Sequence, residues 1–276
     1  MVMKSLYLNA GKTQDFFNEL KDSLSGELVS DNGEHNLILD TDFVKGNIEG
    51  ISFPEGMTYL QFNLIFTDDV ILSMEPLNNS PIFFAYCSEG ALKHSKGLQG
   101  EKRSLKKYHT GILKSATQIN NILYFEKNIP LKFSIIGIGT NKTSEDSNDI
   151  LVGKLKKTFF NKKDDLMHVR SQNFKITEKL EEFNSITQKG IVRNLLKKGI
   201  LKIILAMEIE QHSDSFVKMF EAITCLTLKQ IDEIKRVSNF IMNFPAEGFT
   251  IKFLTQRSVA SPNKLQEGFK LINNQR

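Results

Sequence analysis

The residues best suited to chemistry lie near the end of the chain, on one predicted helix. Leu265 and Phe269 are four residues apart, the spacing that places two side chains on the same face of a helix. The remaining face carries amide, ammonium and carboxylate groups, from Asn263, Lys264, Gln266 and Glu267. Amides can bond adenine edges, lysine can bond guanine, and glutamate can accept from cytosine. We therefore predict that these four residues read DNA bases.

Phosphate contacts are predicted just upstream, where hydroxyl, amide and basic side chains cluster. The predicted phosphate-binding residues are Thr250, Lys252, Gln256, Arg257 and Lys270. Residues 227–276 hold eight Lys and Arg against four Asp and Glu, and eight minus four equals the +4 formal net charge of the whole chain. A basic segment on a neutral body favours contact with a polyanion.

Three short helices must position these groups. The first is predicted over residues 229–243, with Ile231, Ile234, Val237 and Ile241 facing inward. Thr250 would cap the second, with Ile251 and Leu254 inward, and Ser261-Pro262 would open the third. Two short helices joined by a tight connection are the layout of a helix-turn-helix. A three-helix subdomain without a DNA role would give the same pattern.

The spacing resembles one family. Leu254, Ser261-Pro262, Leu265 and Phe269-Lys270 stand at the intervals of the first helix-turn-helix of AraC-type (AraC/XylS) transcription regulators. The resemblance is closest over residues 231–270 and extends upstream only in layout. It implies a sensing domain gated by a small-molecule effector, a dimerisation helix and DNA-reading helices.

The chain departs from the family pattern in its helix-turn-helix and at its end. Thr255 replaces a small alanine, Val259 replaces a turn glycine, and Gly268 interrupts the third helix. Family members carry two helix-turn-helices, whereas only seven residues follow Phe269 here. We therefore expect a chain truncated after the first helix-turn-helix.

The predicted fold class is α+β, with three parts. Residues 1–150 form a cupin-like β-barrel (jelly roll) because short alternating runs, such as Leu60, Phe62, Leu64 and Phe66, are separated by Gly, Pro, Asn or Asp. Further strands are predicted at 70–74, 82–87, 111–115, 122–125 and 132–138, a helix at 13–23, and a loop at 141–149. We expect an effector pocket in this barrel, lined by apolar side chains. The basic run at 93–109 predicts a solvated loop or, alternatively, an anion-attracting mouth to that pocket.

Residues 151–226 form a helical linker and dimerisation segment, followed by the helix-turn-helix subdomain at 227–276. Helices are predicted at 173–183 and 191–211. The second has an apolar stripe so broad that two surfaces are needed to bury it. One surface would be the β domain and the other a second subunit, with dimerisation through Leu196, Ile200, Ile203 and Met207. An internal helix of one globular domain is the equal alternative.

Enzymatic and metal functions are disfavoured by the residues that are missing. The five histidines lack metal-ligand spacing, and the chain has no Walker loop, Rossmann glycine fingerprint, Gly-x-Ser-x-Gly elbow or Cys-x-x-Cys pair. We expect no cofactor, no metal and no catalysis. Without a signal peptide or an apolar run of membrane-spanning length, a soluble cytoplasmic protein is predicted, with Cys87 and Cys225 as buried thiols.

The predicted partners are double-stranded DNA, a small-molecule effector and a second copy of the chain. The leading hypothesis is a sequence-specific transcription regulator. The alternative is a protein–protein interaction module, a truncated relative that dimerises with full-length regulators without strong DNA binding. A cupin-like enzyme or carrier is a third reading, for which no reactive group is found.

Overall fold

The computed structural model describes residues 4–8, 13–75, 81–114, 119–139, 155, 168–212, 233–234, 236–238, 240–241, 248–256 and 261–273. The chain divides into two compact units, residues 1–209 and 210–276. The predicted loop at 141–149, Cys225 and Arg257 lie outside the described residues.

The described part of the first unit combines strands with helices. Its strands are β1 (Lys4–Leu8), β2 (Glu27–Asp31), β3 (Glu34–Asp40), β4 (Val44–Ser52), β5 (Met57–Phe66), β6 (Val70–Met74), β7 (Ile82–Glu89), β8 (Ala91–Lys96), β9 (Arg103–Lys106), β10 (His109–Lys114), β11 (Asn121–Phe125), β12 (Leu131–Ile138) and β13 (His168–Gln172). Its helices are α1 (Thr13–Leu24), α3 (Phe174–Asn184) and α4 (Gly190–His212). The predicted α+β class is confirmed.

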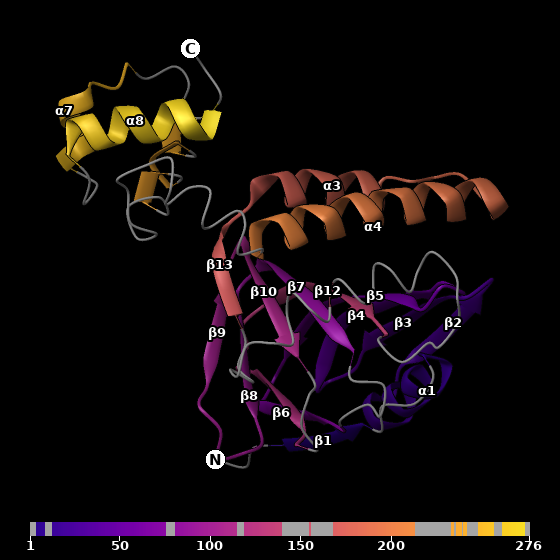
Figure 1. Cartoon of the computed structure of the whole chain (residues 1–276). Helices are drawn as coiled ribbons and strands as arrows, with labels where there is room; N and C mark the ends of the chain where they lie inside the picture. The colour runs from indigo at the N-terminus through magenta and orange to yellow at the C-terminus, as the bar shows by residue number, and fades with distance from the viewer. Residues whose placement is uncertain are drawn as a thin grey trace. The chain divides into compact units, whose positions relative to one another are not determined.

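The strands form two sheets. The small sheet has the order β1-β6-β11-β8-β9, and the large sheet has the order β13-β10-β7-β12-β5-β4-β3-β2. Every pairing is antiparallel except that of β1 with β6. In Figure 1, α3 and α4 lie side by side on one side of the large sheet, and the small sheet and α1 lie on its other side. The N-terminal part is therefore a β-sandwich, as expected of a jelly roll.

Both faces of the large sheet are buried, and each has its own core. The inner core, between the sheets and α1, takes Phe62, Leu64 and Phe66 from β5. The helix-side core takes Met57 and Tyr59 from the same strand, together with side chains of α3 and α4. The predicted inward face of β5 is confirmed, because alternate residues of a strand point to opposite faces. On its other face, Met57 and Tyr59 are buried against the helices, whereas Asn63 is exposed.

The predicted strands correspond to β5, β6, β7, β10, β11 and β12, and the predicted helices to α1, α3 and α4. The predictions missed β1 to β4, β8, β9 and β13. Strand β4 was obscured by glycines, yet Gly46 is required, since a Cβ there would lie 1.9 Å from the backbone oxygen of Asn63. The solvated loop expected at 93–109 is wrong, because β8 and β9 pair there with Leu92 and Leu105 buried.

The second unit contains α7 (Ile251–Gln256) and α8 (Pro262–Asn273). Leu254 and Leu265 are buried with Ile234 and Val237 of the preceding helical residues. Thr250 caps α7 as predicted, since its Oγ1 accepts the Phe253 backbone N–H at 3.2 Å. Ile251, expected to face inward, is 43% exposed. It lies at the first position of a six-residue helix, and the single buried position of that helix is Leu254.

No helix among the described segments is both long and apolar enough to cross a membrane. Within the same segments, no three His, Cys, Asp or Glu side chains gather in an arrangement that could hold a metal ion.

Candidate functional sites

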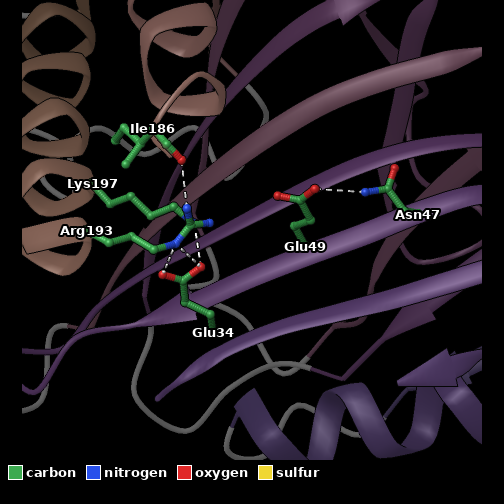
Figure 2. A network of polar contacts seen from close by, with 6 residues as sticks. All are labelled: Glu34, Asn47, Glu49, Ile186, Arg193 and Lys197. Carbon is green, nitrogen blue, oxygen red and sulfur yellow. Dashed lines mark hydrogen bonds and ion pairs between the residues drawn. The ribbon is translucent and has the colours of Figure 1, made fainter. Parts of the chain in front are cut away.

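An ion cluster joins β3 to α4 in the first unit. Arg193 donates from Nε to both carboxylate oxygens of Glu34, at 3.0 and 3.1 Å, and Lys197 donates from Nζ to Oε2 of Glu34 at 2.5 Å. Arg193 also donates from Nη1 to the backbone oxygen of Ile186 at 2.8 Å. Figure 2 shows the two basic side chains extending from the helix toward the carboxylate. We call Glu34, Arg193 and Lys197 the α4 clamp.

Local structure explains why these three groups meet. Glu34 opens β3 and pairs in register with Ile51, so both side chains point to the helix side of the large sheet. Arg193 and Lys197 are four residues apart and therefore share one face of α4. Burial alone would raise the pKa of Glu34, but the hydrogen bonds from Arg193 and Lys197 outweigh burial and lower that pKa below its ordinary value.

Lys197 is unusually well buried for a lysine, with 5% of its surface exposed. Its Nζ lies over the ring of Phe183, 5.0 Å from the ring centre. A buried ammonium needs compensating partners, and here a carboxylate and an aromatic face supply them. The α4 clamp thus ties the helix to β3 at a substantial desolvation cost.

A cavity of about 320 Å³ lies beside the α4 clamp. Its walls come from β2, the β2–β3 turn, β3, β4 and β5, and from α3 and α4. Its lining residues are Val29, Asp31, Asn32, Glu34, His35, Asn36, Glu49, Gly50, Ile51, Tyr59, Phe183, Gly190, Arg193, Asn194 and Lys197. The acids come from the sheet and the bases from α4, so the two walls carry opposite charge.

A row of polar side chains runs from this cavity across the sheet. Asn36 pairs with Glu49, Glu49 with Gln61, and Gln61 with Ser134 in consecutive strands. Glu49 accepts from Nδ2 of Asn47 at 2.9 Å, and Gln61 accepts from the Tyr59 hydroxyl at 2.8 Å. Figure 2 shows the first of these bonds, with Glu49 facing the α4 clamp.

One atom of the row has no partner. The Oδ1 of Asn36 is buried without a hydrogen bond to any described residue. Sequence reasoning missed this polar row because each member is a single residue in a different strand. The one signal was on α4, whose apolar stripe is interrupted by Arg193 and Lys197.

An effector pocket lined by apolar side chains was predicted inside the barrel, and the structure has a cavity elsewhere. The space between the sheets holds a continuous apolar core that includes the stacked rings of Phe62 and Phe133, 4.6 Å apart. The cavity beside the α4 clamp is on the opposite face of the large sheet and is lined by charged residues as well as apolar ones.

The predicted DNA-reading residues lie in the second unit. Asn263 and Gln266 are exposed on α8, Lys264 is partly buried, and Leu265 faces the core. Glu267 and Lys270 are in α8, but their side chains lie outside the described residues. Of the predicted phosphate contacts, Thr250, Lys252 and Gln256 are exposed on or beside α7.

The four predicted dimerisation residues are divided between two faces of α4. Ile200 is 7% exposed and belongs to the helix-side core, against which Met207 also packs. Leu196 and Ile203 are 42% and 44% exposed, beside Val192 and Leu195 at 50% and 61%. We call Val192, Leu195, Leu196 and Ile203 the exposed α4 stripe.

No protein-family model and no curated protein matches the chain. Solved structures do match. A single-residue variant of apo ToxT from Vibrio cholerae is 12% identical over 80% of this chain and 94% of its own, with a TM-score of 0.41. The AraC-like transcriptional activator CuxR is 9% identical over 94% of this chain and 85% of its own, at 0.38. The cupin domain of an XRE-family regulator from Enterobacter cloacae is 14% identical over 33% and 93%, at 0.27.

Proposed function

We propose that the chain is a sequence-specific DNA-binding transcription regulator gated by a small-molecule effector bound in its N-terminal domain. The observation that carries the proposal is the arrangement of α7 and α8. Leu254 and Leu265 are buried together, while Asn263 and Gln266 point away from that core and are exposed. In a helix-turn-helix, the second helix presents such residues to the major groove.

Charge supports the same function. Residues 227–276 carry the whole formal excess of +4, and Lys252 is exposed on α7. Lysine contacts to phosphate fix the position of a protein on the duplex and make its affinity depend on salt. Base contacts from α8 would then supply sequence preference.

The test begins with selection of preferred duplexes from a random DNA pool by the whole chain. Gln266→Ala should change the preferred sequence, since a good bidentate base contact contributes about 1–3 kcal/mol of discrimination. Lys252→Ala should instead weaken binding to all sequences alike and reduce the salt slope by about one. Competition binding at several salt concentrations measures both effects. If Gln266→Ala and Asn263→Ala both retain the original preference, α8 does not read bases.

A second candidate function is a protein–protein interaction module that dimerises with full-length regulators. The exposed α4 stripe favours it, because four large apolar side chains on one helix would be covered by a second subunit. Such a module would give no selected DNA sequence while still forming dimers, which separates it from the first function. In either case we propose that the chain is not an enzyme.

A further inference from the structure

We propose that the cavity beside the α4 clamp binds a small zwitterion of the amino-acid type, with its carboxylate against α4 and its ammonium group against β3 and β4. As the identity of the effector, this inference rests on the proposed function. Binding itself involves the first unit alone and can be measured without DNA.

The α4 wall of the cavity has capacity for one anion. Arg193 and Lys197 contribute two positive charges and Glu34 one negative charge, so the α4 clamp retains a net charge of +1. Lys197 uses one of its three N–H groups on Glu34. Among the described residues, Nη2 of Arg193 has no hydrogen-bond partner, since its bonds leave from Nε and Nη1. A carboxylate is the group that matches these planar and ammonium donors.

The sheet wall carries negative charge and an unsatisfied hydrogen-bond acceptor. Glu49 and Asp31 line the cavity, and within the described parts of the chain neither forms an ion pair. The buried Oδ1 of Asn36 also lacks a donor. An unsatisfied buried acceptor is costly, and an ammonium group could donate to Asn36 and Glu49 together.

The size and the apolar wall restrict the ligand further. A cavity of about 320 Å³ suits a small molecule, and Ile51, Tyr59 and Phe183 form its apolar side. A purely anionic ligand such as phosphate would meet Glu49 and Asp31, and an apolar ligand would leave both charged walls without partners. A zwitterion with a short carbon frame satisfies all three surfaces.

The test is a thermal-shift screen of the whole chain against the twenty free amino acids, followed by calorimetry on the best binder. Its decarboxylated amine and its deaminated acid are matched probes, and each should bind at least tenfold more weakly. Glu49→Gln should weaken binding of the zwitterion at least tenfold while leaving the affinity for the deaminated acid unchanged. Arg193→Gln should weaken binding of both the zwitterion and the deaminated acid, because both carry the carboxylate that Arg193 contacts.

Lys198→Gln is the matched control, since Lys198 is on the same helix but pairs with Glu55 at 2.6 Å and does not line the cavity. Its affinity should equal that of the unmodified chain. If Arg193→Gln does not fold, Glu49→Gln still decides, because Glu49 is outside the α4 clamp. No binding by any amino acid, or unchanged binding in Glu49→Gln, would overturn the inference. Either result leaves the DNA-binding proposal standing, whereas failure of the chain to select any DNA sequence would contradict the proposed function and leave amino-acid binding at this site unaffected.

Discussion

The two faces of the large sheet are both buried, yet they are built from different kinds of residue. The inner face is mostly apolar and rich in phenylalanine, with Phe62 stacked on Phe133 and Phe66 edge-on to Phe125 at 5.1 Å, although the buried His35 stacks on Phe17 there. The helix side mixes apolar residues with buried polar groups. Those polar residues include Tyr59, Gln61, Tyr86, Thr110, Ser134, Lys197 and Glu208.

The two faces differ in what stabilises their buried residues. An apolar core is stabilised by leaving water and needs no specific partner. Each buried polar group, in contrast, needs a hydrogen bond, such as the one that the Tyr86 hydroxyl donates to the backbone oxygen of Asn173 at 3.0 Å. Most polar groups beneath α3 and α4 therefore have partners within the protein, and the buried Oδ1 of Asn36, which has none among the described residues, is the atom that the proposed ligand would satisfy.

The largest expected effect is on the inner face. Phe133→Ala removes a fully buried ring and should reduce the free energy of unfolding by about 3–5 kcal/mol, because a cavity replaces the stacked pair. Chemical denaturation followed by circular dichroism measures the change. Ile129→Ala, at a 49% exposed site, is the control and should change stability by less than about 0.5 kcal/mol. A loss below about 1 kcal/mol for Phe133→Ala would mean that the inner core is not closely packed.

The same contrast explains what sequence could predict. Phe62, Leu64 and Phe66 alternate with a period of two, so β5 and its inner face were predicted from local pattern alone. The helix side was not predictable, since Glu34 and Arg193 are 159 residues apart and meet only through the order of strands in the sheet. Leu254 and Leu265 fall between these cases, because their burial follows from helix spacing whereas the exposure of Ile251 depends on how short α7 is.

The intermediate effect concerns Glu208, which is fully buried on α4 with no partner among the described residues for its Oε2. Burial raises the pKa of Glu208 well above 4.5. A raised carboxyl pKa means that the folded chain holds a proton which the unfolded chain releases, so the contribution of Glu208 to stability falls as pH rises above 4.5. Glu208→Met should therefore raise the free energy of unfolding at pH 7, on the order of 1–3 kcal/mol.

Denaturation of both proteins at several pH values tests the sign. The gain from Glu208→Met should be largest near neutral pH and should shrink toward pH 4.5, where the unfolded carboxyl is also protonated. Glu178→Met, at an exposed site on α3, should change stability by less than about 0.5 kcal/mol at every pH. A gain independent of pH would attribute the effect to hydrophobic burial rather than to the proton.

The smallest expected effect on stability concerns the outer surface of α4, where substitutions should change the oligomeric state rather than the folding of the chain. Replacing Leu195 and Ile203 with glutamate places charges on the exposed α4 stripe, whose side chains are 42–61% exposed. If a second copy covers this stripe, the double variant should sediment as a monomer where the unmodified chain sediments as a dimer. The free energy of unfolding per chain should change by less than about 0.5 kcal/mol, measured where both proteins are monomeric.

Ile200→Glu is the opposite control on the same helix. It buries a charge in the helix-side core, where Ile200 is 7% exposed, and should unfold the chain rather than dissociate it. Sedimentation velocity paired with circular dichroism distinguishes a folded monomer from an unfolded chain. An unmodified chain that is monomeric at tens of micromolar would contradict the dimer. The exposed α4 stripe would then need another partner, because folding buries only the opposite side of α4, which packs against the sheet.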